Sequence, residues 1–413
     1  MYLKNDTYRI FNQLDKWLVF FYMTLLLFGW INLYSVSEEK AFKQLIWIGL
    51  NIFLIPFLFV LKPVDYKYYS FIFYLISLFL LAGVLFLGKE INGAKSWYSL
   101  GVFSFQPVEL AKIGTSLALS DMISKPGYFI GDKKNLFSII LILFLPIFFI
   151  LLQPDPGSVL VFCSFFLVLY KEGLHLGILL LFPFLFILFL FSIYLPFWIV
   201  LSALGVLFFF FIRFQKGIRI RLFSTLIFIM AIGFTLLSPI LFEKVLKGHH
   251  RDRINIIFQN EFDQKYRNNI GYNLLYSKTA IGSGELLGKG YQKGTITKGK
   301  FVPEQHTDYI FCTIGEEWGF LGSLGFIIVY LLFIGRIYQL AEKQNDPFSK
   351  VLGYCLGSIL FFHFFINLSM VMGLMPTIGI PLPFFSYGGS SLWAFTFLVF
   401  LFIRLDASDK ELR

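Results

Sequence analysis

Charged residues are scarce in this sequence. Asp, Glu, Lys and Arg make up 15% of its 413 residues, whereas hydrophobic residues make up 57% and aromatic residues 20%. A soluble globular chain has about one quarter of its residues charged, so the composition excludes an ordinary soluble domain. The formal net charge of +10 is spread among the loops, and it therefore gives no argument for a nucleic-acid partner.

Cysteine is also rare. The chain has three cysteines, Cys163, Cys312 and Cys355, and each lies in or beside an apolar run. One of the three must remain unpaired, and their spacing matches neither a disulfide framework nor a metal cluster. They are therefore predicted to be small core residues.

Long apolar blocks fill most of the chain. A block of roughly 20 apolar residues is long enough to cross the hydrocarbon core of a bilayer as a helix, and lipid leaves no alternative way to satisfy the backbone of such a block. The sequence predicts an all-α, polytopic integral membrane protein that forms one transmembrane domain over residues 1–413. About twelve spans are expected, at 17–35, 42–61, 69–88, 106–122, 136–152, 157–171, 175–194, 197–213, 222–243, 307–335, 351–373 and 386–404.

The short loops differ in their content of Lys and Arg, which predicts the orientation. With the N-terminus in the cytoplasm, most basic residues of the short loops fall on the cytoplasmic side, as the positive-inside rule requires. Both termini are then expected in the cytoplasm. The long loop 244–306 and the junction at Asp308 are expected outside the membrane.

Three segments rich in glycine, proline and polar residues lie on that same outer side, at 88–105, 244–306 and 373–391. Loops on a rigid scaffold often carry function, so this clustering predicts a functional outer face. Asp308 stands where the longest of these loops meets the span near 307, with Glu304 and His306 close before it. A carboxylate at a membrane boundary can reach water and a lipid-linked headgroup together, which suits a base acting on a lipid-linked substrate.

Ionisable residues inside spans are costly and are functional candidates by default. Glu109 and Lys112 are three residues apart, and this spacing places them on one helical face as an ion pair. The pair is expected either to hold helices together or to serve function. Asp155 lies in a Pro-Asp-Pro-Gly turn, where capping of the next helix is favoured over catalysis.

Other polar residues support more than one interpretation. Glu316 and Glu317 are adjacent on a helix and point in different directions, so a structural role is favoured. His363 and Asn367 are four residues apart and predict a hydrogen-bonded patch between helices. The basic residues of loop 244–306 form either a solvated face or a phosphate-binding site, since Arg and Lys both bind phosphate. The candidates for phosphate binding are Arg251, Arg253, Lys278, Lys289, Lys293, Lys298 and Lys300.

Five blocks of sequence resemble the SEDS family (shape, elongation, division and sporulation), and within it the RodA branch. They cover most of the chain in the family's order. The blocks are NGAKSWYSLGVFSFQPVELAK at 92–112, QPDPGS at 153–158, GYNLLYSKTAIGSGELLGKGYQKGT at 271–295, FVPEQHTDYIFCTIGEEWGFLG at 301–322 and GIPLPFFSYGGSS at 379–391.

The resemblance implies a peptidoglycan glycosyltransferase that polymerises lipid II at the outer face of the bacterial cytoplasmic (inner) membrane during cell elongation. It also implies a class B penicillin-binding protein as partner, together with other proteins of the elongation complex. The family's essential loop aspartate falls on Asp308, and its buried pair falls on Glu109 and Lys112. Lys278, Arg251, Arg253, Glu304, His306 and Ser386 are the expected substrate-binding residues. No cofactor is certain, although a divalent cation (Mg or Mn) would suit a diphosphate substrate.

The sequence departs from the family at two places. Pro156 stands where the family usually has Leu, which changes the QPDPGS turn. Twelve expected spans exceed the family's usual ten, so residues 175–243 are expected to contain an extra pair.

The resemblance also implies a mechanism, and it leaves alternatives open. An α-linked diphosphate donor that yields a β-1,4 glycan requires inversion, with Asp308 as general base. The alternatives are an FtsW-like division polymerase, a lipid II flippase, and a scaffold for the penicillin-binding protein. A flippase would need broken helices near the middle of the membrane, whereas the polar segments here gather on one face.

Overall fold

A computed structural model describes residues 13–91, 94–101, 103–215, 217–244, 248–258 and 270–412. Lys4 and Arg9, which contribute to the predicted orientation, and parts of the loop 244–306 lie outside these ranges. The chain divides into two compact units, one made of Met1–Gly173 with Tyr272–Arg413 and the other of Leu174–Gly271. The single domain over 1–413 remains a prediction.

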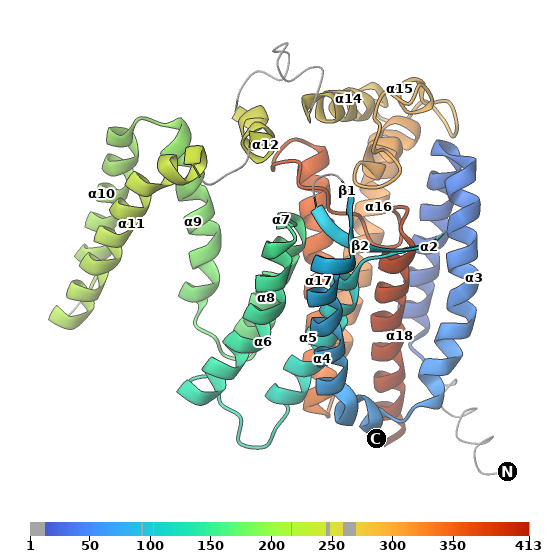
Figure 1. The fold of residues 1–413 in the computed structure, drawn as a ribbon, viewed down its shortest axis with the longest axis horizontal. Helices are drawn as coiled ribbons and strands as arrows, with labels where there is room; N and C mark the ends of the chain where they lie inside the picture. The colour runs from blue at the N-terminus through green and yellow to red at the C-terminus, as the bar shows by residue number, and fades with distance from the viewer. Residues whose placement is uncertain are drawn as a thin grey trace. The chain divides into compact units, whose positions relative to one another are not determined.

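The first unit is built mainly from helices (Figure 1). Its N-terminal part contains α2 (Lys16–Val36), α3 (Glu38–Val60), α4 (Pro63–Leu87), α5 (Pro107–Ile123), α6 (Lys133–Leu152), α7 (Pro156–Phe162) and α8 (Phe165–Lys171). Its C-terminal part contains α14 (Ile270–Ser283), α15 (Thr295–Lys298), α16 (Ile310–Glu342), α17 (Pro347–Val371) and α18 (Gly389–Leu412).

Several helices begin where the sequence provides a starting signal. Pro107, Pro156 and Pro347 each occupy the first turn of a helix, where the missing N–H costs nothing. Asp155 and Asp346 precede two of these helices and accept hydrogen bonds from backbone N–H groups. These caps fix where the loops end, and therefore where the polar residues of the loops lie.

The core of the first unit is formed by α5, α17 and α18. Both α5 and α17 are buried along nearly their whole length, and α18 is buried over most of its apolar part. The helices α3, α4 and α6 instead expose many large apolar side chains, as lipid-facing helices do. In Figure 1, α14 and α15 lie at one end of this unit, and the C-terminal end of α18 lies at the other.

A break interrupts α16 at Gly319, whose φ of 65° and ψ of −162° are not helical. The segment that precedes α15 fills the break. Phe320 and Leu321 donate backbone hydrogen bonds to the carbonyls of Glu285 and Leu286, at 2.8 and 3.1 Å. A backbone interrupted at membrane depth must find partners in the surrounding protein, and this segment provides them.

A small antiparallel sheet occupies the first glycine-rich segment. Its strands are β1 (Lys89–Ile91), β2 (Ala94–Leu100) and β3 (Phe103–Phe105), in the order β1-β2-β3. The Tyr98 hydroxyl donates to the Leu80 carbonyl at 3.0 Å and ties β2 to α4. The protein is mostly helical, as predicted. The sequence does not predict this sheet, because a composition rich in glycine and polar residues does not specify how short strands pair.

The second unit contains α9 (Leu176–Tyr194), α10 (Phe197–Arg213), α11 (Ile218–Lys244) and α12 (Gly248–Phe258). Leu188, Val200, Leu204 and Ala231 form its buried cluster. The Phe208 and Phe228 rings stack with centroids 4.3 Å apart. Residues 175–243 therefore form three helices, as predicted from their apolar runs.

Every predicted span corresponds to helical structure among the described residues. Nine of the described helices are at least 18 residues long and apolar enough to cross a membrane. Three predicted spans fall outside these nine. The fourth corresponds to α5 and the eighth to α10, each 17 residues long, and the sixth consists of two short helices, α7 and α8. The chain therefore has the helical content of a polytopic membrane protein, and twelve crossings remain a prediction.

Candidate active site

Asp308 lies half-buried in the last turn before α16. The Glu304 carbonyl accepts backbone hydrogen bonds from Thr307 and Tyr309, both at 3.1 Å, and the Glu304 carboxylate accepts the Thr307 hydroxyl at 2.9 Å. Glu304 therefore shapes the turn that presents Asp308.

The loop between α17 and α18 packs directly against Asp308. The Asn367 amide donates to the carbonyls of Asp308 and Ile380, both at 2.7 Å, and it thereby joins the two segments. Gly379 has a φ of +82°, and a Cβ built at this residue would lie 3.0 Å from Asp308 Oδ2. The Asp308 carboxylate therefore lies over a position that only glycine leaves open.

Further hydrogen bonds join the segment 304–309 to the loop 373–388. The Ser386 hydroxyl donates to the Thr307 carbonyl at 2.5 Å and accepts the Leu382 N–H at 2.8 Å. The Tyr387 N–H donates to the His306 carbonyl at 2.8 Å. Ser386 and His306 thus hold the loop around Asp308, and their contact with substrate remains a prediction.

The His306 side chain has a perturbed electrostatic environment. Burial lowers the pKa of His306 below its ordinary value, and the positive charge of Lys40 lowers it further, while Glu304 acts in the opposite direction. The Lys40 ammonium also lies 5.9 Å from the centroid of the Tyr387 ring. Burial and the charge of Lys40 both favour the neutral form of the imidazole, which carries no positive charge.

Glu109 and Lys112 form the predicted ion pair, and the pair is buried. Lys112 Nζ lies 2.8 Å from the Glu109 carboxylate and 3.0 Å from Nε2 of His363. Nδ1 of His363 lies 3.0 Å from the Pro381 carbonyl. Because Lys112 donates to Nε2, Nδ1 carries the proton and donates to Pro381. The ion pair is thereby connected to the loop that covers Asp308.

Two other predicted residues lie beside the same loop. Lys278 is exposed on α14, and its Cδ would lie 3.4 Å from a Cβ built at Gly373. Asp155 caps α7, accepting from the Ser158 N–H at 3.1 Å and from the Gln106 amide at 3.3 Å. These contacts agree with the capping role favoured for Asp155.

A glycine brings the Asp155 turn close to the loop 373–388. A Cβ at Gly157 would lie 3.1 Å from the side chain of Ile378 and 3.2 Å from that of Ile380. The loop 373–388 therefore contacts the segments that carry Asp308, Lys278, Lys112 and Asp155.

Arg251 and Arg253 lie on α12, in the second unit. Arg251 Nη1 donates to the Glu243 carbonyl at 3.2 Å. Any role for these two residues at the Asp308 site remains a prediction.

The sequence alone did not reveal what His363 and Asn367 do at the site. Their spacing predicted a hydrogen-bonded patch between helices, and the structure contains one, but the patch also anchors the loop beside Asp308. The only sequence signal was the placement of two polar residues four apart in an apolar helix. Their partners at the loop and at Asp308 are backbone carbonyls, and a sequence pattern cannot indicate those.

The described residues contain no group of three or more His, Cys, Asp or Glu side chains placed to hold a metal ion. Around Asp308, the neighbouring polar groups are mostly amides, hydroxyls and carbonyls engaged with one another.

The sequence pattern of a family described as cell cycle protein, which groups FtsW, RodA and SpoVE, matches residues 10–204 and 199–411. MrdB of Escherichia coli, a peptidoglycan glycosyltransferase, is 29% identical over 384 residues, covering 92% of this chain and 90% of MrdB. RodA of Treponema pallidum, also a peptidoglycan glycosyltransferase, is 30% identical over 407 residues, covering 90% of each chain. FtsW of Haemophilus influenzae, a probable peptidoglycan glycosyltransferase, is 29% identical over 344 residues, covering 82% of this chain and 74% of FtsW.

Solved structures are similar over almost the same length. One chain belongs to a peptidoglycan synthase complex described as coordinating polymerization and crosslinking. Its TM-score is 0.73 at 27% identity, with 96% of this chain and 98% of that chain covered. RodA of Thermus thermophilus gives a TM-score of 0.63 at 26% identity, with 96% of this chain and 97% of that chain covered. The chain is therefore an integral membrane protein that belongs to the FtsW, RodA and SpoVE family of cell cycle proteins, the SEDS family that its motifs resemble.

Proposed function

We propose that this protein is a peptidoglycan glycosyltransferase that polymerises lipid II into β-1,4 glycan strands. Its relatives MrdB and RodA, which are peptidoglycan glycosyltransferases, support this proposal. The observation that carries it is the placement of Asp308, half-buried beside Gly379 at the start of α16. We place the reaction at the outer face of the cytoplasmic membrane, with both termini in the cytoplasm.

The proposed reaction is a single inverting displacement. The 4-hydroxyl of the acceptor sugar attacks the anomeric carbon of the donor, the bond from that carbon to the diphosphate oxygen breaks, and Asp308 takes the hydroxyl proton. Lys278, which lies against the loop beside Asp308, would stabilise the departing diphosphate as a point charge. Arg251 and Arg253 are the other candidates for this role.

We assign the activity to cell elongation, because the GIPLP and GKGYQKGT segments resemble RodA. Relatives named RodA, MrdB and FtsW share similar identities with the chain, so a role in division is the alternative. We also propose a class B penicillin-binding protein as partner, since a similar chain occurs in a complex that coordinates polymerization and crosslinking.

The deciding experiment is glycan formation by the purified protein with fluorescent lipid II, alone and with its cognate class B penicillin-binding protein. We expect glycan strands that lengthen with time, resolved on a gel and sensitive to a muramidase. Movement of lipid II across vesicles without any polymer, even with the partner present, would instead favour the flippase.

Replacing Gly379 with Ala is expected to lower the polymerisation rate about tenfold or more, because the new Cβ would meet Asp308 Oδ2 at 3.0 Å and misplacing a reacting group by about 1 Å can cost up to 10²-fold. A left-handed φ of +82° adds strain of about 1–2 kcal/mol for an L residue. The matched control is Gly325→Ala in α16, where a Cβ meets nothing within 4 Å. Equal rates for both variants would mean that the contact at residue 379 does not position Asp308.

A further inference from the structure

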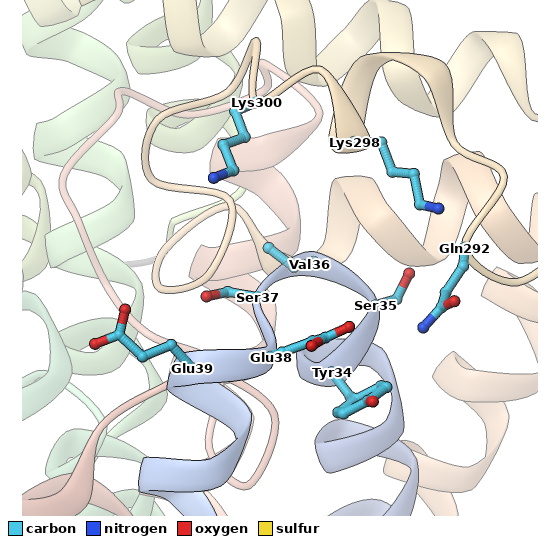
Figure 2. Close-up of a pocket in the computed structure, with 9 residues that line it drawn as sticks. All are labelled: Tyr34, Ser35, Val36, Ser37, Glu38, Glu39, Gln292, Lys298 and Lys300. Atoms are coloured by element: carbon cyan, nitrogen blue, oxygen red, sulfur yellow. The ribbon is translucent and has the colours of Figure 1, made fainter.

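A polar cavity of 360 Å³ lies between the turn that joins α2 to α3 and the segment 292–300 (Figure 2). Its size falls within the range of about 300–1,000 Å³ that is usual for ligand sites. The residues that matter for its chemistry are Tyr34, Ser35, Glu38, Gln292, Lys298 and Lys300.

Hydrogen bonds to Glu316, which is fully buried, stabilise one wall of the cavity. Its carboxylate accepts hydrogen bonds from Lys289 Nζ at 2.7 Å, from the Ile296 N–H at 2.9 Å and from the Thr297 N–H at 2.8 Å. A single buried carboxylate therefore fixes the segment that carries Lys298 and leads to Lys300.

The opposite wall is held by the adjacent residue of α16. The Ser35 hydroxyl donates to the Glu317 carboxylate, and the Asn32 amide donates to the Thr313 hydroxyl at 2.6 Å. The Tyr291 hydroxyl donates to the Ile31 carbonyl at 3.3 Å and joins the two walls directly. Glu316 and Glu317 thus have a structural role, as their adjacent positions predicted. Their hydrogen bonds stabilise the two walls of the cavity.

Two residues that line the cavity have unusual backbone conformations. Gln292 has a φ of 59° and Lys300 a φ of 54°, in the left-handed region that non-glycine residues rarely adopt. Such residues persist where the surrounding structure holds them in place, and they gather at functional and ligand-binding sites. This observation is independent of the cavity's shape, and it points to the same place.

The cavity carries charges of both signs. Figure 2 shows the Lys298 and Lys300 side chains extending from one wall, with Glu38 on the wall across from them. Within the described ranges, no ion pair joins any of these three exposed side chains to another residue. Glu39 differs, because it pairs with Lys43 at 2.6 Å. A cavity lined by two lysine side chains and a glutamate side chain, together with hydroxyl and amide groups, matches a ligand that itself carries both charges.

The cavity is coupled to the segment that presents Asp308. The Gln305 amide donates to the Thr297 carbonyl at 2.8 Å, so the wall that bears Lys298 is tied three residues before Asp308. A ligand bound in the cavity would therefore affect the position of the segment that carries the proposed general base, Asp308.

We propose that this cavity binds the charged peptide carried by the peptidoglycan precursor, with peptide carboxylates toward Lys298 and Lys300 and a peptide ammonium toward Glu38. This inference rests on the proposed function and adds to it a subsite for the peptide. A zwitterionic lipid headgroup would present the same pair of charges, so the test separates the two sources.

The test measures KM and kcat for polymerisation with two substrates, lipid II with its native peptide and lipid II whose peptide is amidated and N-acetylated. For the wild type we expect the neutralised peptide to raise KM about five- to tenfold with little change in kcat. The expected rise in KM is no larger than this because each exposed ion pair contributes little by itself. The double variant Lys298→Glu/Lys300→Glu should raise KM by a similar factor for the native peptide, and much less for the neutralised one. Lys133→Glu/Lys134→Glu, a double charge reversal at two exposed residues of α6, is the matched control and should leave both values unchanged.

The outcomes distinguish this inference from the proposed function. No polymer from the wild type with either substrate would refute the function itself. Polymer with the same KM for both peptides, or equal effects of the double variant on both, would overturn the peptide subsite alone. A KM that follows the phosphatidylethanolamine content of the vesicles, and not the peptide, would assign the cavity to lipid and would also overturn it.

Discussion

Asp308→Asn is expected to lower the rate of glycan polymerisation by about 10²–10⁴-fold, the usual contribution of a general base. The amide has nearly the same shape as the carboxylate but cannot accept the proton of the attacking hydroxyl. The backbone bond from Asn367 to the carbonyl of residue 308, at 2.7 Å, does not involve the side chain, so the turn should survive. The measurement is strand formation from fluorescent lipid II under single-turnover conditions.

The matched control for this variant is Asp121→Asn. Asp121 forms an i,i+4 ion pair with Lys125 at 3.3 Å, and such pairs at the surface contribute little to stability. We expect this variant to polymerise at the wild-type rate and to insert equally well. Full activity of Asp308→Asn would remove Asp308 from the chemical step, and reduced insertion of that variant alone would assign it a structural role.

Lys112→Met is expected to reduce the free energy of unfolding by about 3–5 kcal/mol, because it leaves the buried Glu109 carboxylate without its partner. Lys112 and Glu109 are each only 4% exposed and lie 2.8 Å apart, so water cannot take the place of the missing ammonium. Thermal unfolding in detergent would measure the loss. Lys125→Met removes the lysine of an exposed pair and serves as control, with a change near zero expected.

The double variant Lys112→Met/Glu109→Gln separates the structural role of the pair from its functional role. Replacing both members of a buried pair is often close to neutral, so most of the lost stability should return. We expect the polymerisation rate to stay low, because Nε2 of His363 has lost the donor that fixes its tautomer and with it the bond to Pro381. A rate that recovers together with stability would show that the pair only holds helices together.

The sequence determined the class of protein and the course of its helices, for a simple physical reason. Long apolar blocks can satisfy their backbone in lipid only as helices, and every predicted span corresponds to helical structure in the described ranges. Local signals also sufficed for the Pro-Asp-Pro-Gly turn, where Asp155 caps α7. The spacing of Glu109 and Lys112 sufficed for their ion pair, since both residues lie on one helix.

The sheet and the contacts around Asp308 were decided by tertiary structure. The sheet depends on how the short strands of 88–105 pair with one another, and a polar, glycine-rich composition does not specify such pairing. The site depends on the loop 373–388, which His363 and Asn367 hold through backbone carbonyls of Pro381, Ile380 and Asp308. Every residue has a backbone carbonyl, so a sequence cannot indicate which carbonyl accepts a given hydrogen bond. The packing of α5, α16 and α17 brings these groups within hydrogen-bond distance.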